Sequence, residues 1–265
     1  MGNVFLTAEW RDLVMLNYEV SSDILRERVP VGTELDLFRG KALVSVGGFR
    51  FLNTRVHGLA IPWHRNFDEV NLRFYVHASG DPSRRGVVFV KEIVPRRAIS
   101  WVARALYNEN YHTHPMRSTS SETPTGRTLR YAFTAAGRDH TLRATSTGRW
   151  SSLSPGTEEE FIAEHYFGYA RQRDGGTLKY RVEHPPWRVS AVRDAELDFD
   201  VGALYGAEFI EALCDAPRSA LMAEGSAISV ARPVRVDAAR ARSIENVEPV
   251  PAPSIGGAGA GPSSR

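Results

Sequence analysis

Two adjacent charges, Lys91 and Glu92, interrupt the apolar segment 86–95, which reads GVVFVKEIVP. Strand alternation predicts that Lys91 shares one face with Val87 and Phe89, and that Glu92 occupies the other. Charges inside an apolar strand are costly unless they are paired or placed in a cavity. The segment is therefore either an edge strand whose charges reach water, or a strand that directs one catalytic group into a pocket.

Arginines near this segment are candidates for holding an anion. Arg73 lies on the polar face of the alternating segment 70–77, and its planar, permanently charged fork suits a carboxylate if that face turns inward. Arg96 and Arg97 follow Pro95 at the expected start of a helix, where cations oppose the helix dipole. The alternative for all three is an ordinary position in solvent.

Two Glu-His pairs, Glu164-His165 and Glu183-His184, flank one predicted hairpin. Neighbouring strand residues face opposite ways, so neither glutamate can serve its adjacent histidine. A two-residue loop places both histidines on one face, whereas a three-residue loop places His165 with Glu183. The second register makes a carboxylate-oriented imidazole, which is a common acid-base unit. For His184, a ligand contact and a structural hydrogen bond beside the Pro-Pro-Trp corner both remain open.

The sequence predicts neither a metal nor a cofactor. His112 and His114 have metal-like spacing, but no third and fourth ligand can be named. Cys214 is the only cysteine, which excludes an internal disulfide and a cysteine-based zinc site. No glycine-rich phosphate loop, nucleophile elbow or dinucleotide fingerprint occurs.

Strands dominate the elements that must position these side chains. Residues 14–20 and 70–77 alternate with period two, and 87–94 is the expected antiparallel partner of 70–77. Further strands are predicted over 129–134, 140–146, 165–171, 178–184, 187–192 and 227–230. Short helices are predicted over 22–28, from a capping box at Thr157, and over 201–213. This pattern predicts an α+β, predominantly antiparallel fold with a large curved sheet that encloses a cavity.

Composition and charge limit the binding partners and the cellular compartment that the sequence predicts. The chain has 265 residues with 42% hydrophobic residues and a net charge of +2, so no basic field indicates nucleic acid or membrane binding. No signal peptide or membrane span is recognisable, which predicts a cytoplasmic protein. Residues 1–248 read as a single domain and residues 249–265 as a disordered Pro/Gly/Ser/Ala-rich tail. A homo-oligomer is compatible with the sequence.

Several segments together resemble the uncharacterised bacterial YqjF-like family of the acetoacetate decarboxylase-like superfamily. The resemblance covers the chain to about residue 235. Its hallmarks are Glu34-Leu35-Asp36, Asn66 to Arg73, Gly86 to Pro95, Glu164 to Tyr169, Glu183 to Trp187 and Ala223 to Ser226.

The resemblance implies a cone-shaped, largely antiparallel β structure around a central cavity. Acetoacetate decarboxylase, a member of the same superfamily, forms a Schiff base on a lysine, so we compare its lysine motif with this sequence. The decarboxylase motif places two consecutive lysines after a glutamate and a proline. Here Glu92 and Pro95 match, but Arg96 and Arg97 replace both lysines. A guanidinium stays protonated and cannot attack a carbonyl, so the decarboxylase mechanism does not carry over at these positions.

Three hypotheses follow from the sequence. The first is a pocket protein or enzyme for a small anionic ligand, a carboxylate or keto acid. The second is a Schiff-base lyase that uses Lys91, and the third is a non-catalytic oligomeric scaffold or regulator. Catalysis and simple binding both fit the sequence. The candidate catalytic residues are Lys91, Glu92, His165 and Glu183, and the candidate ligand-binding residues are Arg73, Arg96, Arg97 and His184.

Overall fold

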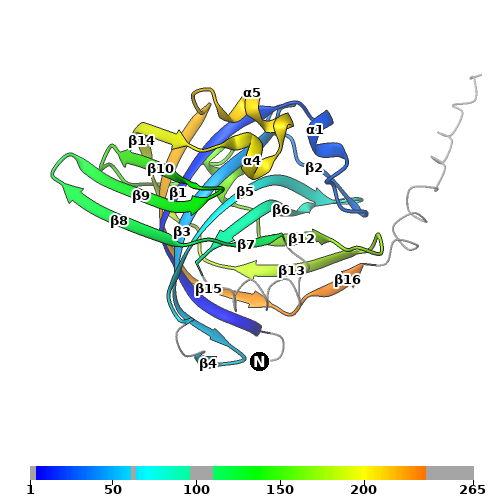
Figure 1. Ribbon diagram of the computed structural model, residues 1–265. Coiled ribbons are helices and arrows are strands. Elements are labelled where there is room, and N and C mark those ends of the chain that lie inside the picture. Colours follow the sequence, from blue (N-terminus) through cyan, green and yellow to red (C-terminus); the bar gives the residue numbers. More distant parts are fainter. Residues whose placement is uncertain (1–3, 61–63, 96–109, 237–265) are drawn as a thin grey trace, which may run out of the picture.

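The computed structural model describes residues 4–60, 64–95 and 110–236, and in this part of the chain sixteen strands join into one sheet (Figure 1). The strands are β1 (Val4–Val20), β2 (Thr33–Leu35), β3 (Ala42–Val56), β4 (Leu59–Ala60), β5 (Phe67–Ala78), β6 (Asp81–Val94), β7 (Tyr111–Thr113), β8 (Met116–Thr123), β9 (Gly126–Ala135), β10 (Arg138–Ser146), β11 (Ser151–Ser152), β12 (Phe167–Arg171), β13 (Thr177–Glu183), β14 (Arg188–Asp198), β15 (Ser219–Ala231) and β16 (Val234–Val236). The helices are α1 (Asp23–Arg26), α3 (Glu158–Ala163), α4 (Val201–Tyr205), the 3-10 turn η1 (Ala207–Phe209) and α5 (Ile210–Leu213).

The sheet closes on itself. Its order runs β13-β12-β6-β5-β3-β1-β15, and the additional pairing of β13 with β15 completes the ring through Val182 and Val230. All junctions of the ring are antiparallel except β12–β6, where Phe167 and Gly168 pair with Gly86 and Val87 in parallel. The predicted curved, closed and mostly antiparallel sheet is confirmed.

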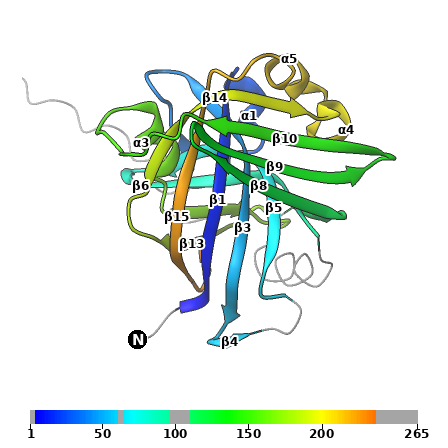
Figure 2. The ribbon, with the colours of Figure 1, turned by 90° about the vertical axis from the view of Figure 1, so that its left-hand side faces the viewer.

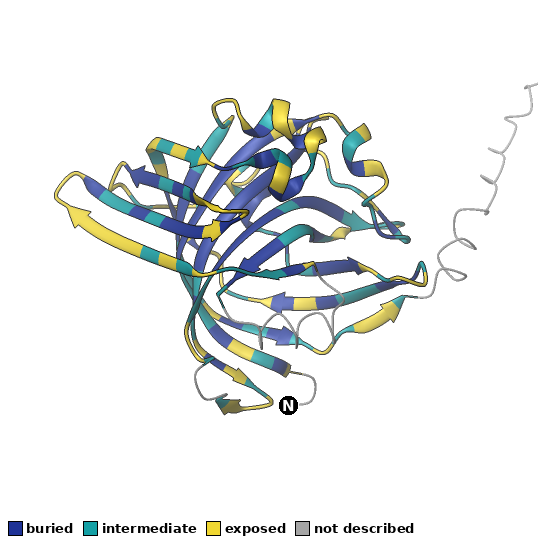
Figure 3. Ribbon diagram, in the orientation of Figure 1, coloured by how far each residue is buried: buried dark blue, intermediate teal, exposed yellow. Residues whose placement is uncertain are grey.

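A second layer branches from the ring. The first half of β15 pairs with β14. Strand β14 pairs in turn with β10, β10 with β9, and β9 with β8 (Figure 2). These strands cross over the long strands β1, β3 and β5, and an outer core fills the space between them. An inner core lies inside the ring, where α3 contributes Phe161 and Ile162. The strands of the ring are therefore buried on both faces along much of their length (Figure 3).

Strand β5 shows the predicted alternation. Val70, Leu72 and Phe74 are fully buried in the outer core, as expected from their shared face. Arg73 belongs to the opposite face, which lines the interior of the ring. The predicted antiparallel pairing of this strand with β6 is also confirmed.

Three bulges change which residues point into the ring. In β6, Lys91 pairs with Leu72 but Phe89 pairs with Arg73, so Val90 is an extra residue between them. The corresponding irregularities in β1 and β3 fall at Asp12 and Asn53, both with positive φ. A bulge shifts the alternation by one residue, and so the inward positions of each strand switch between odd and even numbers.

The bulge at Val90 overturns the predicted faces of Lys91 and Glu92. Val87, Phe89 and Glu92 line the interior, whereas Lys91 pairs with the outer-core residue Leu72. The prediction that Lys91 shares the face of Val87 and Phe89 is therefore wrong, because period-two counting cannot pass through an extra residue.

The helices are shorter than predicted. The helix predicted over 201–213 is interrupted at Gly206, whose φ is 113°: α4 ends before this residue, and η1 begins after it and runs directly into α5. The capping box is confirmed at α3, where the Thr157 side chain accepts a hydrogen bond from Glu160 N. The helix expected after Pro95 and the tail 249–265 lie outside the described residues. Among the helices that are described, none is long and apolar enough to span a membrane.

The parallel junction predicts a sensitive position at Gly86. A Cβ there would lie 2.6 Å from the Phe167 carbonyl oxygen and 2.6 Å from the Tyr169 ring. We expect Gly86→Ala to lower the free energy of unfolding by about 1–3 kcal/mol in urea denaturation, because backbone has to move.

Gly176→Ala is the matched control for this substitution. Its Cβ would meet only the ends of two side chains, Arg235 Nη2 at 3.2 Å and Asp174 Oδ1 at 3.3 Å. Equal stability losses in Gly86→Ala and Gly176→Ala would contradict the close approach at the junction.

Candidate functional site

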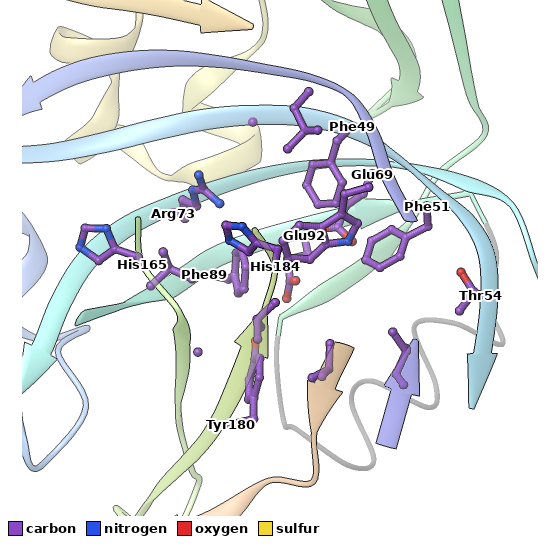
Figure 4. Close-up of a pocket in the computed structure, with 18 of the residues that line it drawn as sticks. Phe49, Phe51, Thr54, Glu69, Arg73, Phe89, Glu92, His165, Tyr180 and His184 are labelled. Atoms are coloured by element: carbon purple, nitrogen blue, oxygen red, sulfur yellow. The ribbon is translucent and has the colours of Figure 1, made fainter. Parts of the chain in front are cut away.

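A cavity of about 210 Å³ occupies the interior of the ring (Figure 4). It is many times larger than the ~10–15 Å³ that one water molecule requires. Its walls are mainly apolar, with a small number of ionisable groups. The polar side chains that line it are Trp10, Thr54, His64, Glu69, Arg73, Glu92, Tyr111, His165, Tyr180 and His184.

Strand pairing arranges the inner wall in successive rows across β1, β3, β5 and β6. Each row lies two residues, or about 7 Å, further along the strands. The first row contains a hydroxyl group and an arginine. The second and third rows each contain one carboxylate, and the last row contains only aromatic residues. In order, the rows are Asn17–Ser45–Arg73, Met15–Gly47–Asn71–Glu92, Phe49–Glu69 and Trp10–Phe51–Phe67.

Glu69 is the carboxylate whose protonation the interior changes most clearly. Only 2% of the residue is exposed, and Asn71 Nδ2 donates to its Oε1 at 2.9 Å. Burial raises the pKa of Glu69 to about 7, although the Asn71 hydrogen bond, the charge of Arg73 and a hydrogen bond from Tyr111 lower it. The group can therefore give or take a proton near neutral pH.

Asn71 links the two buried carboxylates. It pairs across the sheet with Glu92, which is 1% exposed, while its side chain donates to Glu69. The neighbouring position on β3 is Gly47, where a Cβ would lie 3.2 Å from Asn71 Oδ1. Glycine at position 47 thus leaves room for the amide that separates Glu69 from Glu92.

Arg73 is a cation that lacks a carboxylate partner within salt-bridge distance in the described part of the chain. Its Nη2 donates to Met15 Sδ at 2.9 Å, and its guanidinium carbon lies 5.9 Å from the centre of the Tyr75 ring. Its Nε is buried and has no hydrogen-bond partner among the described residues. Tyr75 is held in turn by a hydrogen bond of 2.5 Å between its hydroxyl and Ser45 Oγ.

His165 belongs to a chain of three ionisable groups. Its Nε2 lies 3.1 Å from Asp36 Oδ2, and Arg85 Nε donates to the same oxygen at 2.7 Å. A carboxylate accepts only, so Nε2 carries the proton and Nδ1 is left as an acceptor. Nδ1 is buried and has no hydrogen-bond partner within the described ranges.

The protonation states of this group follow from its surroundings. Burial lowers the pKa of His165 to about 4, against the raising effect of the Asp36 hydrogen bond, and the charges of Arg85 and Arg73 lower it further. Burial raises the pKa of Asp36, but hydrogen bonds from His165 and Arg85 outweigh burial and lower it to about 2. At neutral pH His165 is a neutral base held by an ionised Asp36.

Of the predicted acid-base partners, the structure brings His165 and Glu92 to the cavity and leaves Glu183 outside. Glu183 is exposed, on the face of β13 opposite to Tyr180 and Val182, and Arg181 lies near it at 3.4 Å. The hairpin register does align His165 with Glu183, but β12 begins only at Phe167. Of the two registers that the sequence left open, the one that aligns His165 with Glu183 is present, but Asp36 and not Glu183 orients the imidazole.

The other predicted residues have different placements. Arg73 and His184 line the cavity, and His184 stacks on Trp187 with ring centres 4.1 Å apart while its Nδ1 lies 3.0 Å from the Pro185 carbonyl. Arg96 and Arg97 lie outside the described residues.

All three lysines of the chain, Lys41, Lys91 and Lys179, are described, and none of them lines the cavity. Burial lowers the pKa of Lys91, but its amine lies on the outer-core side of β6. No group of three or more potential metal ligands occurs among the described residues.

Two important residues, Glu69 and Asp36, were not identified as candidates from the sequence. Glu69 could have been found, because the polar face that contains Asn71 and Arg73 extends two residues further back to it. Asp36 is 129 positions from His165, and no periodicity joins the two.

The fold is that of the acetoacetate decarboxylase-like proteins. A structure of acetoacetate decarboxylase from Legionella pneumophila superposes with a TM-score of 0.61 at 13% identity, over 88% of this chain and 87% of that one. A structure of the enduracididine biosynthesis enzyme MppR complexed with pyruvate gives a TM-score of 0.62 at 13% identity, over 90% and 93%. An acetoacetate decarboxylase-like enzyme from Sphingomonas wittichii RW1 gives 0.57 at 14% identity, over 89% and 94%.

Sequence comparison narrows this class to one family. Residues 7–227 match the DUF2071 family, which is described as an uncharacterized conserved protein. The chain is also 30% identical over 213 residues to the uncharacterized protein YqjF of Bacillus subtilis, covering 76% of this chain and 80% of that protein. The chain belongs to the DUF2071 family, and the resemblance seen in the sequence is confirmed.

The raised pKa of Glu69 predicts a pH-dependent effect of Glu69→Gln. Between the unfolded value near 4.5 and the folded value near 7, the folded state binds the proton more tightly, so wild type loses stability as the pH rises through this window. The neutral glutamine avoids this loss. The measured quantity is the free energy of unfolding of Glu69→Gln minus that of wild type. We expect this difference to be about 2–3 kcal/mol larger at pH 8 than at pH 4.5.

Denaturant melts across pH 4 to 8 measure this difference. Glu183→Gln, which removes an exposed carboxylate, is the matched control and should follow wild type. A Glu69→Gln difference that stays constant with pH would show that Glu69 is not buried as described.

Proposed function

We propose that this protein binds a small carboxylate of the keto-acid class in the cavity of the ring and exchanges a proton with it. The observation that carries the proposal is Arg73, a partly buried guanidinium whose Nε has no hydrogen-bond partner and which forms no salt bridge with a carboxylate among the described residues. A buried cation without a counter-ion is costly, and a bound anion would remove that cost.

The chemistry of a guanidinium favours a carboxylate as this anion. Arg73 offers several N–H donors in one plane, which match the two oxygens of a carboxylate. Its only hydrogen bond in the described structure is to the soft sulfur of Met15, a weak acceptor. A carboxylate would replace this contact with stronger, charge-assisted hydrogen bonds.

Two groups near Arg73 support proton transfer to or from the ligand. Glu69 has a pKa of about 7, which is close to the optimum for a general acid or base at neutral pH. His165 is held by Asp36, and its Nδ1, which accepts no hydrogen bond from any described residue, can receive one from a hydroxyl of the ligand. Glu69 can thus gain or lose a proton near neutral pH, whereas His165 is neutral there.

The related folds support the same ligand class. One neighbouring structure is an enzyme complexed with pyruvate, and another is an acetoacetate decarboxylase, whose substrate is named as a keto acid. Sequence identity to both is 13%, so this support concerns the class of ligand only.

The other two hypotheses have less support. A Schiff base requires a lysine in the cavity, and none lines it in the described structure. A scaffold without a ligand would not need several titratable groups to converge on one interior space, whereas Glu69, Arg73, Glu92 and His165 do so (Figure 4).

The proposal predicts that Arg73→Ala weakens binding of pyruvate at least tenfold in isothermal titration, since the charged partner of the carboxylate is lost. Arg73→Lys should recover part of the affinity, because it keeps the charge without the planar fork.

Arg117→Ala is the matched control. Arg117 is an arginine of β8 whose side chain is 65% exposed and which does not line the cavity. Pyruvate binding that survives unchanged in Arg73→Ala would refute the proposed site, and so would an absence of binding to wild type by pyruvate and every other keto acid tested.

A further inference from the structure

The cavity continues well beyond the groups that would hold and protonate a small keto acid. Arg73 and Phe67 are six positions apart on β5, which is at most about 20 Å of extended chain. The acidic rows around Glu69 and Glu92 lie between these two ends. A three-carbon acid bound at Arg73 would leave the far end of the cavity unfilled.

That far end is an aromatic cluster formed by Trp10, Phe49, Phe51 and Phe67. Phe51 and Phe67 are stacked, with ring centres 4.5 Å apart and planes 14° apart. Trp10 meets Phe51 edge to face at 5.8 Å, and Figure 4 shows Phe51 on the opposite side of the carboxylates from Arg73, with Phe49 beside Glu69. Rings arranged in this way offer both faces and edges to a further ring.

The same end also holds two hydrogen-bonding groups without partners. Thr54 is 6% exposed, and its hydroxyl has no hydrogen-bond partner among the described residues. Trp10 Nε1 is buried and equally unsatisfied within the described ranges. Both residues line the cavity. Buried polar groups without partners are uncommon in a packed core, and they mark this end as a surface that a ligand completes.

On the basis of the proposed function, we infer that the ligand is a carboxylic acid with an aromatic or comparably bulky apolar tail. The acid lies at Arg73, the reacting carbons lie on the side of Glu69, and the tail extends toward Trp10, Phe51 and Phe67. The carboxylate thus supplies orientation, and burial of the tail supplies most of the discrimination between acids.

The test compares two keto acids that differ only by a phenyl group, pyruvate and phenylpyruvate. Titration calorimetry on the full chain should give phenylpyruvate at least tenfold tighter binding than pyruvate. Phe67→Ala should reduce this advantage at least threefold, because it weakens phenylpyruvate more than pyruvate. Arg73→Ala should weaken both acids by a similar factor.

Two further variants control the comparison. Leu59→Ala removes an apolar side chain on β4 that is 73% exposed and lies outside the cavity, and it should change neither affinity. Phe67→Leu keeps an apolar side chain at this position and replaces Phe67→Ala if the smaller residue prevents folding. It should still lower the preference for phenylpyruvate, because stacking on Phe51 is lost.

The outcomes separate this inference from the function on which it rests. Equal affinity for pyruvate and phenylpyruvate would overturn the apolar tail and leave the acid site intact. An advantage of phenylpyruvate that persists in both Phe67 variants would overturn the placement of the tail. Binding of neither acid to wild type would overturn the proposed function together with the inference.

Discussion

Closure of the sheet between β13 and β15 is the constraint on which the interior of this protein depends. An open sheet could leave its polar face in water, but a ring turns that face into the wall of a cavity. Every charged side chain on the wall then loses solvent and needs a replacement for it. The chemistry of the site follows from how each group meets this requirement.

The ionisable groups of the interior compensate for the loss of solvent in three different ways. Asp36 stays ionised because His165 and Arg85 both donate to one of its oxygens. Glu69 accepts from Asn71 and responds to burial with a raised pKa. Arg73 can do neither, since a guanidinium does not lose its proton and no described carboxylate forms a salt bridge with it. We assign the anion site to Arg73 because its positive charge has no salt-bridge partner among the described residues.

The sequence predicted the elements well where alternation is uninterrupted. In β5 the buried positions Val70 and Leu72 and the inward position Arg73 follow directly from period two. In β6 the bulge at Val90 reverses the faces of Lys91 and Glu92, and no residue type in that segment marks it. Bulges of this kind redirect side chains near functional sites, and they depend on the partner strand as much as on the bulged one.

The partner of His165 could not be predicted for a different reason. Local register did suggest Glu183, and the hairpin has the register that would align the two. The chain leaves β12 before His165, however, so the imidazole turns to Asp36 from a distant segment. Such a contact is decided by closure of the whole ring, and local spacing carries no information about it.

A crystal structure of the protein soaked with phenylpyruvate would test the central claim most directly. The account predicts a carboxylate within hydrogen-bonding distance of the Arg73 guanidinium and a ring that extends from it toward Phe67, inside the cavity of the β-ring. A ligand bound outside this cavity, or one inside it with its carboxylate away from Arg73, would contradict the account.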